Sequence, residues 1–561
     1  MSNDPDTAAR FTRRRLLHSV GAVTVGGALA SLLAACGGSN APTAPSSTSR
    51  STATGSSGGT SSTPASGAAV LTPTPPPAAA IKRGGTVIVA QSSDATTLDP
   101  AHTTATVDGE IYTAIYDKLV DLDQNGNVVP FLATSWEEAG DHLSWTLHLR
   151  QGVKFHDGTD FNADSVKTNI ERYIDPKQNS PRKGEIPYVT GVTVVDPYTA
   201  KIELSQAFVV LMYSLAGTTG VMVSPAAIQK YGADLASNPV GTGPFVFKSW
   251  VKNDKVEVTR NPSYWKPGLP YLDTVDYRGI SDASVIVTGM QSNAIQATYG
   301  VPANDVPSLK TNPDMQLLLH PSTSISSLRL NCAASPFDKK EIRQALSWAI
   351  DRAAIEKSLF FDTGTPANSF LGPLNLGYNK GITLYNQLDT AQAKQLLATG
   401  GQPNGFSFNA QTTNSTDALK LAQAIKSQLA AIGVTMNLQL LDGVTLLQKL
   451  VQKDFQASFV TFNGGVEPFQ GFDRFFYSKS PIDVYGYTNP QFDDLLTKAA
   501  ATGDTNARVQ LYQQMAQILS EDCPWIFLRY PAQTELFRKE IKGYVYNPDG
   551  DLRLDTVWLS S

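Results

Sequence analysis

The chain of 561 residues has few of the side chains on which metal and thiol chemistry depends, namely three cysteines and six histidines. The histidines show no H-x-x-H or H-E-x-x-H spacing, and the cysteines show no close pairing of the kind that holds zinc. A phosphate-binding G-x-x-x-x-G-K-[ST] loop is missing as well. The sequence therefore contains no motif of a metal-dependent or nucleotide hydrolase, and nickel capture has only a thin basis.

The chain also lacks an excess of positive charge. Lysine and arginine total 45 against 50 aspartates and glutamates, and the formal net charge is −5. Because nucleic-acid binding depends on cationic patches that meet phosphates, this balance argues against a nucleic-acid partner. The composition, 41% hydrophobic and 17% charged, is typical of a globular protein. A chain of this length is expected to form two or three domains.

The N-terminal segment carries the densest basic cluster of the chain. Arg13 and Arg14 stand before a weakly apolar run over residues 16–35. The stretch TRRRLLHSVG resembles a twin-arginine export signal, and LAAC resembles a lipobox, in which Cys36 receives lipid. Together they predict a signal peptide over residues 1–36 and an exported protein, lipid-anchored on the outer face of the cytoplasmic membrane. The run is also long enough for a plain transmembrane anchor, which is the alternative.

Residues 37–81 are dominated by Gly, Ser, Thr, Ala and Pro. Such a segment cannot bury enough apolar surface to offset the entropy of ordering its chain, so it is predicted to be a disordered linker. The stretch GSSGG within it matches the hydrolase pattern G-x-S-x-G. No predicted strand precedes the match and no helix follows it, so it gives no support to a hydrolase.

A polar cluster within residues 152–165 raises the possibility of a catalytic or metal site; it contains His156, Asp157, Asp160 and Asp164. The spacing of a calcium-binding EF-hand is not met. Asp157-Gly158 suits a tight turn, and Asn162 is a favourable N-cap for a helix with Val166, Ile170 and Tyr173 on its buried side. The preferred interpretation is therefore structural, and a secreted hydrolase that uses His156 is the remote alternative.

Strands and helices are predicted from Gly84 onward. GGTVIVAQ has the β-branched composition of a strand. Residues 109–120 place apolar side chains four apart and predict a helix, and residues 143–150 alternate between apolar and polar side chains as a half-buried strand does. The pattern indicates an α/β body.

Long segments of this body resemble the extracytoplasmic solute-binding proteins of ABC importers, family five, the oligopeptide, dipeptide and nickel class. The similarity is carried by LSWTLHLRQGVKFHDGTDFNADSV, NPVGTGPFVFKSW, LRLNCAASPFDKKEIRQALSWAIDRAAI and NPQFDDLLTKAAATG. It implies an α/β, periplasmic-binding-protein-like two-lobe fold (class II, large peptide-binding type) with mixed sheets and an interlobe cleft. Lobe I would comprise residues 82–325 and 531–561, and lobe II residues 326–530.

The resemblance also implies a function. Such a protein is expected to be a monomer without enzymatic activity or cofactor. It captures a small solute, most often a peptide, and delivers it to the permease and ATPase subunits of an ABC transporter. A sugar, an oligosaccharide, nickel or another solute stays as an alternative ligand within the family, and a surface adhesin or sensory subunit is a third possibility.

The same resemblance implies a set of ligand-binding residues. Peptide-binding members carry a W-x-x-D-Y-x-D-P segment whose first Asp holds the ligand ammonium, and FNGGVEPFQGF is the matching stretch here. Gly464 stands in place of that Asp, which weakens the peptide assignment and suits a bulky neutral ligand such as a sugar. The expected contacts on the two lobes are Asp94, Thr97, Phe462, Asn463, Gly464, Gly465, Glu467 and Phe469. The alternative is that NGGVEP is only a loop.

The two cysteines that follow Cys36 leave two possibilities open. Cys332 and Cys523 would lie in an exported body, where a disulfide is permitted. Both also suit burial as small apolar side chains.

Overall fold

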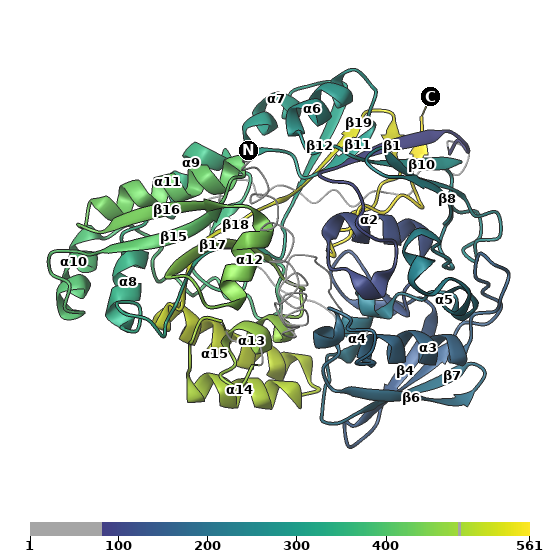
Figure 1. Cartoon of the computed structure of the whole chain (residues 1–561), viewed down its shortest axis with the longest axis horizontal. Coiled ribbons are helices and arrows are strands. Elements are labelled where there is room, and N and C mark those ends of the chain that lie inside the picture. Colours follow the sequence, from purple (N-terminus) through teal and green to yellow (C-terminus); the bar gives the residue numbers. More distant parts are fainter. Residues whose placement is uncertain (1–80, 481–483, 561) are drawn as a thin grey trace, which may run out of the picture.

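The computed structural model describes residues 81–480 and 484–560. The predicted signal peptide over residues 1–36 lies outside them, as does all but the last residue of the predicted linker over residues 37–81. Figure 1 shows two bodies side by side, joined at the top of the view by β-strands. Among the described residues, no helix combines the length and the apolar character needed to cross a membrane.

The first lobe is built around a mixed seven-stranded sheet. Its strands, in spatial order, are β12 (Met315–His320), β19 (Gln533–Arg538), β11 (Ala297–Tyr299), β1 (Thr86–Gln91), β10 (Thr274–Gly279), β9 (Lys255–Arg260) and β8 (Phe245–Val251). β1 lies in the middle and pairs in parallel with β10 and β11. Helices of this lobe are α2 (Thr106–Ile115), α5 (Pro225–Tyr231), α6 (Ala283–Gln291) and α7 (Val306–Lys310).

A smaller antiparallel sheet completes the first lobe. Its strands, in spatial order, are β4 (Ala133–Glu138), β5 (Ser144–Leu149), β7 (Thr199–Leu204) and β6 (Val189–Asp196). The helix α3 (Ala163–Ile174) packs on β6 and β7, and α4 (Leu211–Leu215) follows this sheet in the chain. Two further sheets have only two short strands each: β2 (Val120–Leu122) pairs with β3 (Val128–Pro130), and β20 (Ile541–Lys542) pairs with β21 (Trp558–Leu559).

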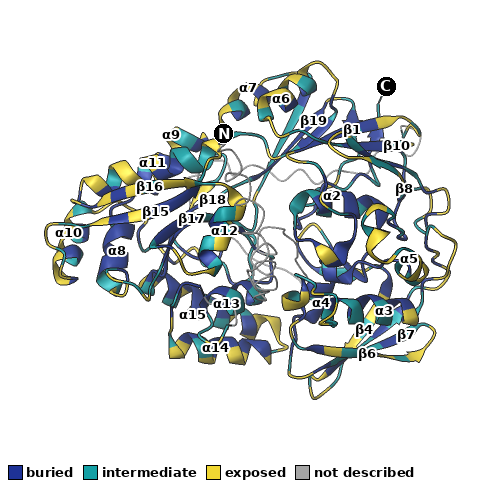
Figure 2. Ribbon diagram, in the orientation of Figure 1, coloured by how far each residue is buried: buried dark blue, intermediate teal, exposed yellow. Residues whose placement is uncertain are grey.

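The second lobe is built around a mixed six-stranded sheet. Its strands, in spatial order, are β14 (Thr365–Pro366), β18 (Trp525–Tyr530), β13 (Ser324–Leu330), β17 (Ala457–Asn463), β15 (Ser407–Thr413) and β16 (Thr435–Leu441). Its helices are α8 (Lys340–Trp348), α9 (Arg352–Phe360), α10 (Thr390–Thr399), α11 (Thr416–Ala430), α12 (Gly443–Val451), α13 (Phe469–Phe476), α14 (Pro490–Ala500) and α15 (Thr505–Asp522). The strand β18, which lies between β14 and β13, is buried along its whole length, as Figure 2 also shows, and this burial explains its nearly continuous apolar sequence.

The chain crosses between the two large sheets twice. It leaves the first sheet after β12 and enters the second at β13, and it returns from β18 to β19. Residues 321–323 and 531–532 make these crossings, and they lie within a few residues of the boundaries predicted after residues 325 and 530. The exact limits of the two lobes stay a prediction.

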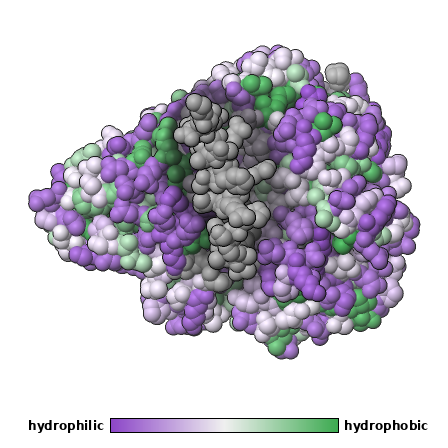
Figure 3. Space-filling model, viewed as in Figure 1, coloured by the Kyte–Doolittle hydropathy of each residue, from purple (hydrophilic) through white to green (hydrophobic). Residues whose placement is uncertain are grey.

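The two lobes touch below the crossings, where α4 faces α13, α14 and α15 (Figure 1). The ring of Phe208 packs edge-on against Phe469 with centroids 6.0 Å apart. The backbone N–H of Val209 donates to the carbonyl of Ala500 at 3.4 Å. Apolar side chains of both lobes therefore form one continuous core cluster at this contact. Figure 3 shows that the outer surface on this face is mainly hydrophilic, with apolar residues in small scattered groups.

The turn and helix predicted after residue 155 are confirmed. Gly158 has φ +86°, as the tight turn requires. Asn162 caps α3 by accepting from the N–H of Ser165, whose hydroxyl in turn accepts from the N–H of Asn162. The predicted side of α3 is buried, including Val166, Ile170 and Tyr173.

His156 is part of this structural unit. Its Nε2 donates to the carbonyl of Gly243 at 3.0 Å, and its Nδ1 accepts from the N–H of Gly241 at 3.4 Å. Burial lowers the pKa of His156, which suits a neutral imidazole with one donating and one accepting nitrogen. Asp157 accepts from Ser224 at 2.5 Å, and Asp160 pairs with Lys154 at 2.7 Å.

One predicted helix differs from the structure. Residues 109–120 were expected to be helical, but α2 covers Thr106–Ile115 and ends there. Lys118 instead forms an antiparallel bridge with Val221, and the N–H of Leu119 donates to the carbonyl of Gly220 at 2.8 Å. Pairing with a distant segment has therefore replaced the last helical turn, although Leu119 is still buried.

The disulfide considered for Cys332 and Cys523 does not form between these two residues in the described structure. Cys523 is buried in the core of the second lobe, as a small apolar side chain would be, and Cys332 is half-buried.

Candidate functional site

A cavity lies between the two lobes, at the inner ends of α4 and α13. It encloses about 880 Å³, including the part that opens to solvent. The first lobe contributes Arg182, Glu185, Val210, Tyr213, Ser214, Gly217 and Thr218 to its wall. The crossing contributes Thr323, and the second lobe contributes Phe370, Asn375, Phe462, Asn463, Gly464, Gly465, Glu467, Pro468, Gln470, Gly471 and Arg474.

The helix α13 forms one wall because its sequence is strongly amphipathic. Residues three and four apart share one face of a helix, and the cavity residues of α13 follow this spacing: Gln470, Gly471 and Arg474. Glu467 lies just before the helix and also lines the cavity. The phenylalanines of α13 lie buried on its other side. At Gly471, an added Cβ would lie 2.8 Å from Cζ of Phe370, so the glycine lets that ring approach the helix.

Glu467 lines the cavity, but its carboxylate is already paired. Arg508 donates from Nη2 to Oε2 of Glu467 at 3.3 Å, and each side chain is only 3% exposed. The N–H of Phe469 donates to Oε1 at 3.4 Å. Burial raises the pKa of Glu467 and the charge of Arg508 opposes that shift. The carboxylate is therefore held by its own protein rather than presented to a ligand.

Gly464 lies where the resemblance places an ammonium-binding aspartate. The hydroxyl of Thr323 donates to the carbonyl of Gly464, and the N–H of Gly464 donates to the carbonyl of Thr323 at 3.4 Å. A Cβ at this position would lie 3.0 Å from Cε1 of Phe462, so a larger side chain would displace that ring. Phe462 stacks on Phe370 with the centroids 5.9 Å apart, and the two rings form an apolar wall.

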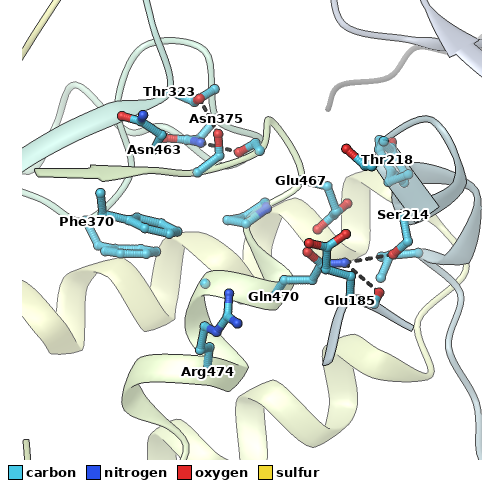
Figure 4. A pocket seen from close by; sticks show the side chains of 18 of the residues that line it. Glu185, Ser214, Thr218, Thr323, Phe370, Asn375, Asn463, Glu467, Gln470 and Arg474 are labelled. Atoms are coloured by element: carbon cyan, nitrogen blue, oxygen red, sulfur yellow. Dashed lines mark hydrogen bonds between the residues drawn. The ribbon is translucent and has the colours of Figure 1, made fainter. Parts of the chain in front are cut away.

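The wall of the first lobe comes from η4 (Lys183–Glu185) and α4. Arg182, the N-cap of η4, pairs with Glu185 at 2.9 Å. Gln470 of the second lobe reaches this wall: its Nε2 donates to the carbonyl of Glu185 at 2.9 Å and to Oγ of Ser214 at 2.7 Å. Figure 4 shows Gln470, Ser214 and Glu185 meeting at the lobe contact, with Arg474 on the same helix as Gln470.

The structure brings five of the predicted ligand-binding residues together in this wall: Phe462, Asn463, Gly464, Gly465 and Glu467. Oδ1 of Asn463 accepts from Ser324 at 2.7 Å, and the carbonyl of Gly465 accepts from Asn375 at 2.7 Å. Phe469 instead lies behind the wall, buried against Phe208.

The other two predicted residues lie elsewhere in the first lobe and do not belong to the described cavity lining. Asp94 accepts from Nε1 of Trp250 at 3.3 Å and from the N–H of Asn253 at 2.8 Å. Oγ1 of Thr97 accepts from the N–H of Asp99 at 3.1 Å. The side chains of Asp94 and Thr97 thus stabilise loops of the first lobe through hydrogen bonds.

Sequence reasoning missed the first-lobe wall, in particular Arg182, Glu185, Tyr213, Ser214 and Thr218. These residues form no motif along the chain, and they meet the second lobe only when the protein folds. In residues 81–480 and 484–560, no three His, Cys, Asp or Glu side chains lie together so as to hold a metal ion.

Comparison with known proteins agrees with this arrangement. Residues 127–483 match the family described as bacterial extracellular solute-binding proteins, family 5, middle. The glutathione-binding protein GsiB of Escherichia coli K12 is 32% identical over 471 residues, which cover 82% of this chain and 92% of that protein. GsiB of Shigella flexneri is 31% identical over the same shares of the two chains.

Solved structures are also similar. The periplasmic binding protein DppA of Helicobacter pylori, in complex with the peptide STSA, has a TM-score of 0.76 and 27% identity, with 86% of this chain and 99% of that chain covered. AgaA of Agrobacterium tumefaciens R10, in complex with agropinic acid, has a TM-score of 0.75 and 29% identity, with 85% and 99% covered. The two-lobe fold implied by the sequence is confirmed, and the chain belongs to the bacterial extracellular solute-binding proteins of family 5.

Proposed function

We propose that the protein captures a short peptide in the cavity between its lobes and delivers it to an ABC importer. The observation that carries the proposal is that one cavity is lined by side chains of both lobes. A solute that contacts both walls stabilises the closed arrangement. At a ligand concentration of about 100 times its Kd, this stabilisation is about 2.7 kcal/mol. The peptide-binding and glutathione-binding relatives support the same ligand class.

The chemistry of the cavity suits a peptide. The amides of Asn375, Asn463 and Gln470 offer groups that can exchange hydrogen bonds with a peptide backbone. The stacked rings of Phe370 and Phe462 offer an apolar surface for a side chain. This placement supports the proposal that residues 462–467 contact the ligand.

The remaining parts of the proposal concern the setting in the cell. The protein is exported through the signal at Arg13 and Arg14 and is tethered by lipid at Cys36. It acts as a monomer and passes its solute to the permease and ATPase subunits. It carries out no chemical reaction on the solute.

A second candidate ligand is a non-peptide organic acid. The complex of AgaA with agropinic acid and the glycine at position 464 both favour this alternative over a strictly ammonium-anchored peptide.

Calorimetric titration with a panel of peptides, glutathione and sugars tests the proposal. Micromolar binding of glutathione or of a short peptide, with no change in the solute after incubation, is expected. Binding of a sugar alone would overturn the peptide assignment, and hydrolysis of a bound solute would overturn the receptor role.

A further inference from the structure

We propose that the core of the second lobe binds a small inorganic anion of about the size of chloride, with Arg329 of β13 as its cationic partner. Arg329 is buried and does not belong to the described cavity lining. The anion is therefore independent of the solute that the cavity captures.

Arg329 is a buried cation without a carboxylate partner. Its residue is only 2% exposed. Nη1 donates to the hydroxyl of Tyr485 at 2.7 Å, whereas Nε and Nη2 have no hydrogen-bond partner among the residues that the structure describes. No Asp or Glu of residues 81–480 and 484–560 forms an ion pair with it. Because a buried charge is costly unless it is paired and hydrogen-bonded, this guanidinium indicates a negative partner.

Aromatic rings compensate the charge of Arg329 only in part. The guanidinium carbon lies 3.7 Å from the ring centroid of Trp525 and 5.1 Å from that of Phe475. Cation–π contact stabilises the charge but leaves the N–H groups of Nε and Nη2 without acceptors in the described structure. Phe475 in turn packs on Phe462 of the cavity wall, with the centroids 5.0 Å apart. The anion would therefore neutralise a charge that lies one ring behind this wall.

Arg352, another buried arginine of the second lobe, shows how such a side chain is satisfied within the protein. It is 3% exposed. Its Nε donates to the carbonyl of Phe527 at 2.7 Å, Nη1 to the carbonyl of Ser347 at 3.0 Å, and Nη2 to Oγ of Ser347 at 2.7 Å. Every nitrogen of this guanidinium thus has a partner. The unpaired nitrogens of Arg329 are therefore a local feature and not a general property of arginines in this core.

The residues opposite Arg329 on the two adjacent strands also carry unpaired polar atoms. Arg329 pairs with Trp525 of β18 and with Ser458 of β17, and directly opposite residues share one face of a sheet. Nε1 of Trp525 and Oγ of Ser458 are buried without a hydrogen-bond partner in the described part of the chain. Three neighbouring residues therefore carry unused N–H or O–H donors, which is the chemistry that binds an anion.

A buried water is the alternative occupant. Oε1 of Gln411, which lies opposite Ser458 on β15, is an unpaired acceptor in the described structure. A water between Ser458 and Gln411 would satisfy both side chains, because water donates and accepts. It would leave the charge of Arg329 uncompensated, so the Arg329 end of this row favours an anion. Since protein interiors contain few voids larger than a water molecule, the occupant is a small ion such as chloride.

Thermal unfolding of the variant Arg329→Met tests the site. Methionine keeps a long side chain against Trp525 and removes the charge and the donors. The Tm of each protein is measured in sodium chloride and in sodium gluconate at equal ionic strength. The gain in Tm from gluconate to chloride should be larger for the natural protein than for the variant by at least about 2 °C, because an ion that binds only the folded state stabilises it.

Comparing the two gains removes general salt effects, which act on both proteins alike. Equal gains for the natural protein and Arg329→Met would overturn the inference, because Arg329 would then respond to no anion. Lys154→Gln is the matched control, since it also removes one positive charge but from an exposed side chain. Its gain in chloride should equal that of the natural protein.

Anomalous diffraction from crystals of the natural protein in sodium bromide needs no variant, so it decides even where Arg329→Met fails to fold. A bromide peak within hydrogen-bond distance of Arg329 or of Nε1 of Trp525 is expected. A water without anomalous signal at this place, or a dry contact, would overturn the inference. A bromide peak combined with equal gains in Tm would mean an adventitious ion only, and it would overturn the inference as well.

Discussion

Gln470 donates from Nε2 to Oγ of Ser214 at 2.7 Å, although the two residues are 256 positions apart in the chain. The same nitrogen donates to the carbonyl of Glu185 at 2.9 Å. The side-chain amide of Gln470 in the second lobe thus makes two hydrogen bonds to the first lobe, at the edge of the cavity. Together with the Phe208–Phe469 contact, it holds the two lobes in contact in the arrangement that the structure shows.

Gln470→Ala should favour the open arrangement. It removes two neutral hydrogen bonds across the cleft, each contributing about 0.5–1.5 kcal/mol. Small-angle scattering of the ligand-free protein should therefore give a larger radius of gyration. Gln517→Ala is the matched control, since Gln517 lies exposed on α15 and bonds only to Glu521 within its helix in the described structure. Identical scattering curves for all three proteins would show that this contact does not hold the lobes together.

His156→Ala should reduce stability and leave ligand affinity unchanged. The imidazole bonds to Gly241 and Gly243, away from the described cavity lining. Loss of these two bonds is expected to lower the free energy of unfolding by about 1–3 kcal/mol in chemical denaturation. Loss of affinity in the calorimetric titration at unchanged folding would instead place His156 in the binding site.

Glu110 should make the protein less stable as the pH rises. Burial raises the pKa of its carboxyl to about 8, with Asp551 acting in the same direction and Gln91 opposing. The folded state therefore binds more protons than the unfolded state between about pH 4.5 and 8. The stabilisation by protonated Glu110 is complete below this window and is lost as the pH rises through it.

Glu110→Gln checks this linkage because the amide keeps the shape and can still accept from Gln91. Between pH 5 and pH 8, the free energy of unfolding should fall less for the variant than for the natural protein. The difference between the two falls is about 3–5 kcal/mol at most, since one pKa unit corresponds to about 1.4 kcal/mol. Glu137→Gln is the exposed control. Parallel pH profiles for the natural protein and Glu110→Gln would contradict the assignment.

The two described cysteines should react differently with a thiol reagent. Cys523 is 2% exposed, and burial raises the pKa of its thiol, so both access and the thiolate population are low. Cys332 is half-buried and should be modified first under native conditions. Mass spectrometry of peptides prepared without reductant should show no disulfide-linked peptide that joins Cys332 to Cys523, whereas detection of that linked peptide would contradict the structure.

Local features of the fold could be predicted well from the sequence. The turn at Gly158 and the cap at Asn162 depend on residues within a few positions of each other, so their residue types are sufficient. The strand β1 was recognisable by the β-branched residues of GGTVIVAQ. The end of α2 was not, because Lys118 and Leu119 pair with a segment about 100 residues later in the chain.

Only the second-lobe wall of the candidate site could be predicted from the sequence. The segment from Phe462 to Glu467 was found because it matches a continuous family motif. Arg182 and Ser214 belong to no such motif, and their position in the cavity depends on how the lobes meet. The pairing of Glu467 with Arg508 joins residues 41 positions apart, and it could not be predicted from the sequence either.

Hydrogen–deuterium exchange with and without saturating glutathione tests most directly whether a solute is held between the lobes. The account predicts slower exchange on both sides of the cavity, in residues 182–185 and 213–218 of the first lobe and 462–474 of the second. Exchange should stay unchanged at the edge strand β8 and at its neighbour β9. Protection confined to one lobe, or to neither, would contradict the account.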